Sequence, residues 1–448
     1  MTRQSLVFLA GLFLYEASFG QDVLHQYIQE GFEKNQSIQQ QALLLEKSIY
    51  ALKEAKTRFA PGLSFLSDYY LAAGGRTVDF PAGDLLNPVY GSLNQLTRSN
   101  DFPQLENQRI LLNPNNFYDA RFRIGLSLLN PEIDYNKRIK REQVSFQKVE
   151  IDLYKRELAK EIKTAYFTFL QSVAAIKIYD MALELVRENK RINESLFENG
   201  KVNRTVVLRA ENEITKFQAI RESAQQQSNS ARAYFNFLLN RNLADSIVVD
   251  DSFKRTVAFY ADSTTVGQRE ELQKLKIAAS VNQQKEGLAK SFIIPKLSTF
   301  LDLGSQGFDW QLDNHTRYSF FGLSLKWDLF AFGRNSHTIK QAQLDNRIIQ
   351  SQMDYLEAQL QLQYTNSINE FNSTLFSYES AISTYKASQK YHADVLRLYK
   401  EGQALYLELL DAQNQLVDSE LQVTISLYET YIKAAEIERA NASFNTNN

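Results

Sequence analysis

The positions of proline and glycine constrain this chain more than any other feature of its sequence. The seven prolines all lie between residues 61 and 295, and none lies in 132–294 or in 296–448. Gly200 is the only glycine from 126 to 266, and Gly402 is the only one from 334 to 448. Proline costs a helix interior about 3 kcal/mol and glycine about 1 kcal/mol. Both stretches therefore predict long helical hairpins that turn at Gly200 and Gly402.

The first 20 residues have a different character. Arg3 precedes the apolar run Leu6–Tyr15, and small residues follow up to Gly20. This pattern is typical of a secretory signal peptide, expected at residues 1–20. A membrane anchor is the alternative, but the run is shorter than the ~20 residues that a spanning helix needs. The mature protein is therefore expected to be exported.

The two halves of the chain resemble each other. Three blocks recur in the same order, in which 35–64 aligns with 269–298, 125–128 with 322–325, and 197–200 with 399–402. Such a pattern indicates an internal two-fold repeat. The first repeat, 21–240, is expected to hold a helix, strands at about 62–72 and 118–129, a longer loop at roughly 73–117, a long helix at 132–199 and a return helix at 204–240. The second, 266–448, is expected to hold a helix, strands at about 296–304 and 318–327, a long helix at 335–401 and a return helix at 405–440.

The long helices carry a coiled-coil pattern. The apolar positions of the second one are spaced 4, 4, 3, 4, 3, 4 and 3 residues apart: Leu360, Tyr364, Ile368, Phe371, Leu375, Tyr378, Ile382 and Tyr385. This is close to a heptad seam, which predicts packing against neighbouring helices. At 1.5 Å per residue, the helix at 132–199 is on the order of 100 Å long. An intracellular scaffold coiled coil is the alternative, and the signal peptide and strands count against it.

Between the helices the apolar period changes to two. Apolar side chains alternate with polar or small ones, and the apolar set is expected to face lipid: Phe122, Ile124, Leu126, Leu128, Phe321, Leu323, Leu325 and Trp327. The pattern fits a transmembrane β-barrel wall, with a soluble β-sandwich as the alternative. Four strands cannot close a barrel, since about eight is the practical minimum, and lipid does not tolerate open edges. Several copies must then share one barrel, continued by the helices as a hollow duct.

Composition excludes most other functions. Lys and Arg total 50 against 52 Asp and Glu, which gives no basic excess for nucleic acid. The chain has no cysteine, and its four histidines lack metal-ligand spacing. No nucleophile elbow, phosphate loop or dinucleotide fingerprint occurs. We expect no enzyme activity, catalytic residue, cofactor or metal site.

At this point the sequence resembles the TolC-type outer-membrane efflux and secretion proteins. The resemblance covers nearly the whole mature chain and rests on the order and spacing of loose motifs. They are Val23–Ile28 with Asn35, Leu52–Lys56 before Pro61, Leu325–Gly333, Tyr399–Gly402, and Leu409–Ala412 with Leu416.

The resemblance implies a mainly α fold with a small β part. Three identical chains would form a 12-stranded β-barrel in the outer membrane of a Gram-negative bacterium, four strands from each chain. Their helical hairpins would form an α-barrel through the periplasm. A girdle would lie at 241–265, where Ser246–Asp251 suggests a short strand. The partners implied are a periplasmic adaptor protein and, through it, an inner-membrane pump.

The resemblance also implies site residues. The turns that would dock the adaptor are Gly200, Lys201, Val202, Gly402, Gln403 and Ala404. Glu408 and Asp411 match acids that ring the periplasmic aperture, and Tyr399 and Thr205 match its gate network. Ala404 stands where that network has an arginine, for which Arg204 and Arg209 are the candidate substitutes, and Val206 stands where it has an acid.

Three-fold symmetry would place six carboxylates around the opening, and such a ring attracts cations. Ordinary solvated helix charges are the alternative for Glu408 and Asp411. An exit duct for efflux or type I secretion is the function expected. A periplasmic structural coiled-coil protein and a secreted helical adhesin remain as alternatives, and the sequence does not identify the cargo.

Overall fold

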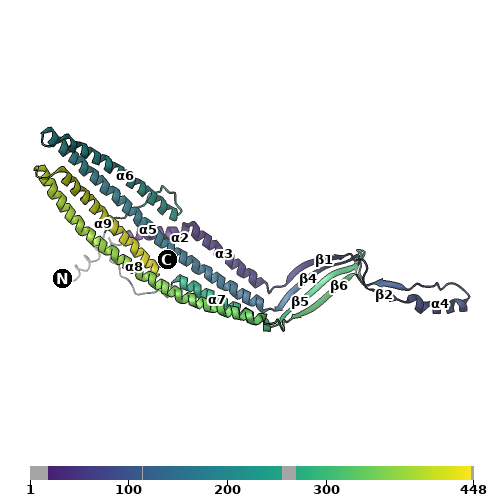
Figure 1. Cartoon of the computed structure of the whole chain (residues 1–448). Helices are drawn as coiled ribbons and strands as arrows, with labels where there is room; N and C mark the ends of the chain where they lie inside the picture. Colours follow the sequence, from purple (N-terminus) through teal and green to yellow (C-terminus); the bar gives the residue numbers. More distant parts are fainter. Residues whose placement is uncertain (1–18, 114, 255–268, 445–448) are drawn as a thin grey trace, which may run out of the picture. The chain divides into compact units, whose positions relative to one another are not determined.

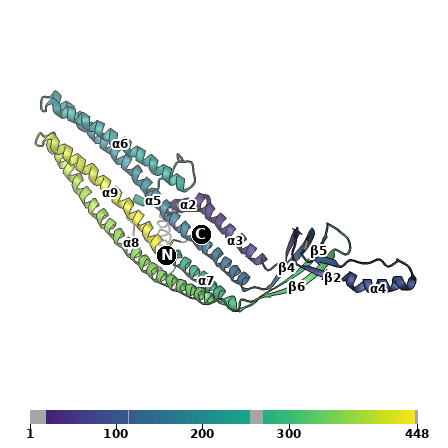
Figure 2. The ribbon, with the colours of Figure 1, turned by 45° about the vertical axis from the view of Figure 1, so that its right-hand side comes forward.

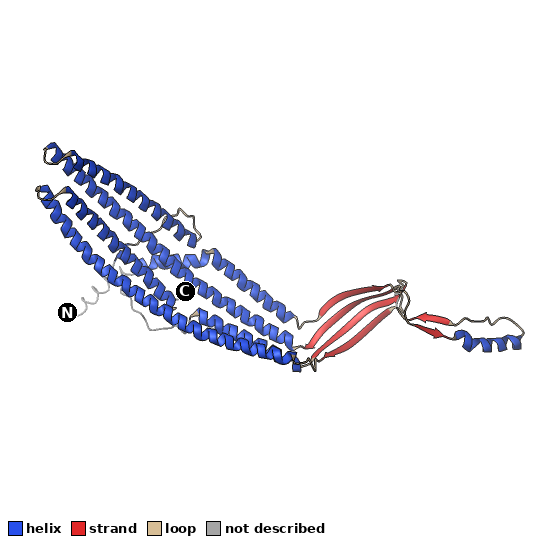
Figure 3. Cartoon of the chain, viewed as in Figure 1, coloured by secondary structure: helices blue, strands red, loops and turns tan. Residues whose placement is uncertain are grey.

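The structure is a computed structural model that describes residues 19–113, 115–254 and 269–444. The signal peptide expected at 1–20 lies almost wholly outside the described residues, as does part of the expected girdle. The chain divides into two compact units. A helical unit contains the chain up to Tyr50, Arg141–Gln283 and Gln343 onward. A strand unit contains Ala51–Lys140 and Gln284–Ala342. The prediction of a mainly helical protein with a small strand part is confirmed (Figure 3).

Two long hairpins make up most of the helical unit (Figure 1). The first joins α5 (Pro131–Glu198) to α6 (Arg204–Leu238), and the second joins α8 (Arg334–Lys400) to α9 (Tyr406–Ala440). The turns of both hairpins lie at the same end of the unit. The shorter helices are α2 (Phe19–Lys34), α3 (Gln36–Thr57) and α7 (Glu270–Lys290).

The apolar seams of the helices form the core of this unit. Leu360, Tyr364 and Phe371, all from the predicted heptad pattern of α8, are buried together with Ala434 and Ile437 of α9. The largest cluster packs α2, α5 and α6 around aromatic rings. The ring centroids of Tyr27 and Phe235 are 5.0 Å apart, and those of Tyr166 and Phe235 are 5.7 Å apart.

The prediction of a short strand at Ser246–Asp251 is wrong. This segment is irregular, and a 3-10 helix, η1, follows it at Asp251–Lys254. Side chains take the place of a partner strand. The Tyr166 hydroxyl donates to the Val248 carbonyl at 2.9 Å, and the Val248 N–H donates to the Tyr27 hydroxyl at 3.0 Å. Because the backbone groups of Val248 already have partners, no ladder is needed.

The strand unit is built on one antiparallel sheet with the order β1-β4-β5-β6. Its strands are β1 (Gly62–Tyr70), β4 (Phe117–Leu129), β5 (Lys296–Phe308) and β6 (Arg317–Lys326). Among the residues that the structure describes, neither β1 nor β6 has a second strand partner. The sheet therefore has two open edges.

The register gives the sheet two different faces. Phe65, Phe122 and Leu303 pair across three strands on the first face, and all three side chains are exposed. On the opposite face, Arg123 donates two hydrogen bonds of 2.7 Å to the Asp302 carboxylate. The sheet thus separates an exposed apolar face from a charged one.

The loop expected at 73–117 contains regular structure that the sequence did not reveal. A two-stranded ribbon pairs β2 (Thr77–Phe80) with β3 (Gln108–Leu111), and α4 (Ala82–Thr97) lies between them in the chain (Figure 2). We call residues 77–111 the insertion. Among the helices described, none is both long enough and apolar enough to cross a membrane.

Candidate functional site at the hairpin turns

Both hairpin turns use the same backbone device. Gly200 and Gly402 have φ angles of 68° and 75°, in the left-handed region. The Lys201 N–H donates to the Leu196 carbonyl at 2.8 Å, and the Gln403 N–H donates to the Leu398 carbonyl at 2.8 Å. This is the Schellman arrangement that ends helices. A Cβ at either glycine would meet nothing within 4 Å, so backbone conformation alone favours glycine here.

An apolar core lies beneath the turns and joins the two hairpins. We call it the tip core. Its buried members come from α6, α8 and α9: Ala210, Val395, Tyr399, Tyr406, Leu409 and Ala412. Ile192 and Leu196 of α5 pack against it, as do Val206 and Ala404. The positions where the resemblance would place an acid and an arginine are therefore occupied by apolar side chains that pack into the core.

Two neutral hydrogen bonds cross between the hairpins in this region. The Tyr399 hydroxyl of α8 donates to Asn193 Oδ1 of α5 at 2.5 Å. Asn189 Nδ2, one turn earlier on α5, donates to Gln413 Oε1 of α9 at 2.5 Å. Burial raises the pKa of Tyr399, so its hydroxyl keeps its proton at neutral pH. Burial, with the nearby charge of Glu213, raises the pKa of Tyr406 to about 12.

The sequence analysis named Tyr399 but missed its partners. Val186, Asn189, Asn193 and Leu196 are spaced 3, 4 and 3 residues apart, so the two asparagines continue an apolar seam. Polar residues at seam positions are the signal that could have identified them.

The tip region also contains buried polar atoms without partners among the described residues: Asn193 Nδ2, Gln413 Nε2 and His392 Nε2. Each such atom costs about 1–3 kcal/mol. Burial also lowers the pKa of His392.

Glu408 and Asp411 are both exposed, one turn apart on α9, and so share one side of the helix. Glu408 Oε2 accepts a 2.9 Å hydrogen bond from the Leu405 N–H at the start of α9. Asp411 Oδ2 accepts one of 2.8 Å from Gln415 Nε2. Neither carboxylate forms an ion pair among the residues described, so both keep their charge available to solvent.

Thr205 has a local role. Its N–H donates to Asn203 Oδ1 at 3.1 Å, and its hydroxyl also donates to that oxygen. Asn203 is the N-cap of α6. The hydrogen bonds of Thr205 therefore serve the start of α6, whereas Tyr399 bonds Asn193. Arg204 and Arg209 are exposed, and in the described part of the chain neither forms an ion pair.

Around the turns themselves, Gly200, Lys201, Gly402 and Gln403 are exposed, whereas Val202 is half-buried. Seven of the eight expected lipid-facing residues lie on β4 or β6, and Trp327 is the exception. Phe122, Phe321, Leu323 and Leu325 are between 53% and 67% exposed. The register of β4 shifts beside Leu128, and Trp327 follows the last residue of β6.

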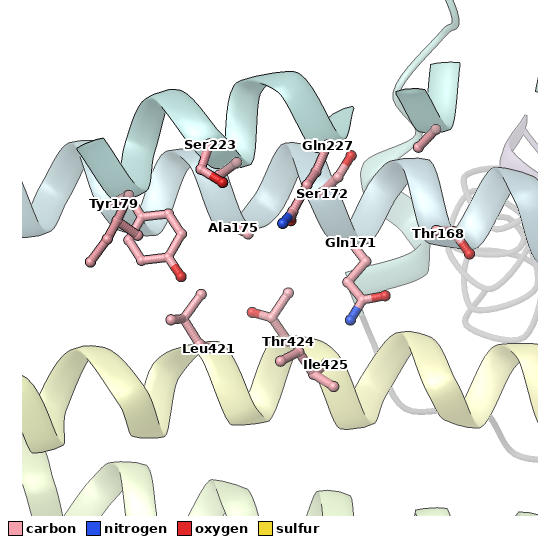
Figure 4. Close-up of a pocket in the computed structure, with 13 residues that line it drawn as sticks. Thr168, Gln171, Ser172, Ala175, Tyr179, Ser223, Gln227, Leu421, Thr424 and Ile425 are labelled. Carbon is pink, nitrogen blue, oxygen red and sulfur yellow. The ribbon is translucent and has the colours of Figure 1, made fainter. Parts of the chain in front are cut away.

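A cavity of about 380 Å³ lies further along the helical unit, between α5, α6 and α9 (Figure 4). Small and neutral side chains such as Ser172, Ala175, Ser223 and Thr424 line it, with Tyr179 at one end. Its lining holds no carboxylate, histidine or cation. Among the described residues, no group of three or more His, Asp or Glu side chains is placed to hold a metal ion.

No protein-family model matches the sequence, and no curated protein matches it. Solved structures do match. The CmeC outer membrane channel of Campylobacter jejuni is 12% identical with a TM-score of 0.74, and the match covers 96% of this chain and 89% of that one. The open state of the MtrE outer membrane channel of Neisseria gonorrhoeae is 15% identical with a TM-score of 0.72, covering 93% and 88%. The outer membrane protein VceC of Vibrio cholerae is 13% identical with a TM-score of 0.70, covering 93% and 95%.

Proposed function

We propose that this chain, which has the fold of the TolC-type outer-membrane channels, is the outer-membrane exit duct of a tripartite efflux pump or type I secretion system. The observation that carries the proposal is the four-stranded sheet, with its two open edges and its exposed apolar face. In lipid an unpaired edge costs several kcal/mol for each unsatisfied backbone group. Pairing β6 of one copy with β1 of the next removes both edges.

In the proposed duct three copies close a 12-stranded barrel in the outer membrane of a Gram-negative bacterium. The face with Phe122, Phe321 and Leu323 meets lipid, and the face with Arg123 and Asp302 lines the water-filled lumen. Eight strands are the practical minimum for closure, so four strands from one chain are too few. The two-fold repeat of 21–240 and 266–448 supplies equivalent hairpins to the α-barrel, and 241–265 contributes to a girdle.

The hairpin turns form the periplasmic end of this duct. The exposed turn residues Gly200, Lys201, Gly402 and Gln403 dock a periplasmic adaptor and, through it, an inner-membrane pump. Glu408 and Asp411 from three copies place six carboxylates around the aperture. Supporting this, both side chains are exposed and free of ion pairs among the described residues.

The proposal is tested with protein purified in detergent. We expect a trimer by mass measurement and discrete conductance in planar bilayers. The double variant Glu408→Ala, Asp411→Ala should lose most cation selectivity and most block by divalent cations, because the ring carries the charge at the narrowest point. Glu429→Ala, an exposed acid far along the same helix, is the matched control and should keep both.

Two outcomes would count against the proposal. A monomer that stays in solution without detergent would exclude the duct and favour a structural coiled-coil protein or a secreted adhesin. If the double variant forms a conducting trimer with unchanged cation selectivity, the aperture assignment of Glu408 and Asp411 is wrong but the duct is not excluded.

A further inference from the structure

The insertion contains a helix whose polar side is already occupied. Asn87 Nδ2 donates to the Leu105 carbonyl at 2.9 Å, and the Leu105 N–H donates to Asn87 Oδ1 at 2.8 Å. Asn94 exchanges the same two bonds with Phe102, at 2.8 Å and 3.1 Å. The asparagines of α4 therefore hold the return segment 99–107 in the manner of a strand partner. A Cβ at Gly83 would lie 2.3 Å from the Leu105 carbonyl oxygen, so the two backbones meet closely there.

The opposite side of α4 is apolar. Leu86, Val89, Leu93 and Leu96 are spaced 3, 4 and 3 residues apart, which is the heptad spacing of a coiled-coil seam. We call these four residues the α4 seam, and Leu85 lies beside it. Val89 is 53% exposed and Leu96 is 81% exposed. Leu86 is 40% exposed and Leu93 is half-buried, so three of the four seam residues are exposed in the described part of the chain. Figures 1 and 2 show α4 as the only helix in this part of the chain.

We propose that the α4 seams of three copies pack against one another as a short parallel three-helix bundle. The inference rests on the proposed trimeric duct. The insertion joins the last residue of β1 to the first of β4, whereas α3 and α5 join the other ends of these strands. A shared barrel therefore brings three insertions to the mouth that lies away from the helices. The bundle stands at that mouth.

The charge pattern favours a second copy over other occupants. The only charged residue of α4 is Asp84, whose carboxylate accepts a 3.0 Å hydrogen bond from Asn107 at the side of the return segment. Identical helices can then approach without like-charge repulsion. A helix that lies on a lipid surface usually carries Lys or Arg on its polar face, and α4 has neither.

The seam is short, and two heptads would not hold free chains together, since isolated helices this short are marginal in water. In the trimer, however, association becomes intramolecular, and tethering supplies an effective concentration of about the mM range. Weak contacts between the three seams are then sufficient to form the bundle.

Cysteine crosslinking tests the inference directly, because the chain contains no cysteine of its own. Val89→Cys and Leu96→Cys are made singly, and the detergent-purified trimers are oxidised with copper phenanthroline. We expect disulfide-linked dimers from most trimers of both variants. Gln95→Cys is the matched control, since Gln95 is exposed on another side of α4. It should stay largely uncrosslinked and react fully with a maleimide-polyethylene glycol reagent.

Crosslinking no greater than in Gln95→Cys, with equally fast maleimide labelling, would overturn the bundle. Protection of the Val89→Cys or Leu96→Cys thiol only after reconstitution in phospholipid vesicles, without a disulfide, would assign the seam to lipid and also overturn it. Mass and conductance are measured on the same samples. A conducting trimer without crosslinks rejects the bundle but leaves the duct, whereas absence of a trimer rejects the duct itself.

Discussion

The buried ion pair between Arg156 and Glu270 should be a main determinant of stability in the helical unit. Arg156 lies on α5 and Glu270 in the first turn of α7, and their side chains are 8% and 7% exposed. Arg156 Nη2 and Nε donate to Glu270 Oε1 at 2.6 Å and 2.9 Å. Arg156 Nη1 donates to the Phe444 carbonyl at 2.7 Å. One guanidinium thus connects three parts of the chain.

The size of the effect follows from burial. Removing one partner of a buried pair leaves an uncompensated charge, which typically costs about 3–5 kcal/mol. Arg156→Met and Glu270→Leu should each lose roughly that amount. Replacing both partners with Arg156→Met, Glu270→Leu leaves no orphan charge, and such replacements are often near neutral. The double variant should therefore recover most of the loss, apart from about 1 kcal/mol for the bond to Phe444.

The free energy of unfolding is measured in detergent by circular dichroism at 222 nm against denaturant. The control is the exposed pair of Arg191 and Glu188, 76% and 49% exposed, joined at 2.7 Å. Its disruption should cost no more than about 0.5 kcal/mol. Single variants of Arg156 and Glu270 that match this control would refute the reasoning. So would a double variant whose loss equals the sum of the two single losses.

Two further predictions concern the tips. Gly402→Ala and Gly200→Ala should each lower stability by about 1–2 kcal/mol, because a Cβ is disfavoured at positive φ. Gly91→Ala, inside α4, is the control and should raise stability slightly. Amide hydrogen exchange at the tips measures the effect of the first two variants, and unchanged exchange would contradict the prediction. Wild-type stability should fall from pH 7.5 to 5.5, because burial lowers the pKa of His392 below its ordinary 6.5 and the unfolded chain takes up the proton first. In His392→Phe the denaturant midpoint should therefore depend less steeply on pH. An identical pH dependence of the midpoint in both proteins would refute the assignment.

The long helices were predictable because proline and glycine, which disfavour helical structure, lie at or near their ends. The helix expected at 132–199 runs from Pro131 to Glu198, and the one expected at 335–401 runs from Arg334 to Lys400. Pro131 is tolerated as the first helical residue because the N–H it lacks would be unpaired there anyway. Gly200 and Gly402 supply the left-handed turns. These are local constraints, so a single sequence reveals them.

The prediction of a short strand at Ser246–Asp251 failed because of contacts with residues far away in the sequence. Ile247, Val248 and Val249 have high β-propensity. A strand also needs a partner, and Tyr27 and Tyr166 instead occupy the backbone groups of Val248. No local pattern reveals that two tyrosines from distant helices meet this segment.

The insertion was missed because its signals contradict one another. Pro81, Pro88, Pro103 and Pro114 favour a loop at 73–117, and Pro88 lies inside α4. The seam spacing favours a helix, but in a monomer such a seam should face a core. Here the asparagines take the inner side and the leucines face outward. In the proposed bundle the partner of the seam is another copy, which the pattern of a single sequence does not identify.

The same limit applies to the tip core, where two hydrogen bonds that the resemblance did not imply link the hairpins. Tyr399 with Asn193, and Asn189 with Gln413, link the hairpins through neutral groups. Salt screens exposed charges but has little effect on buried neutral bonds. In the proposed duct, ionic strength would therefore act on the carboxylates of Glu408 and Asp411 and leave these two hydrogen bonds unchanged. Ion selectivity and closure would thus depend on different residues, which charge-removing variants at 408 and 411 can separate from amide-removing variants at 189 and 193.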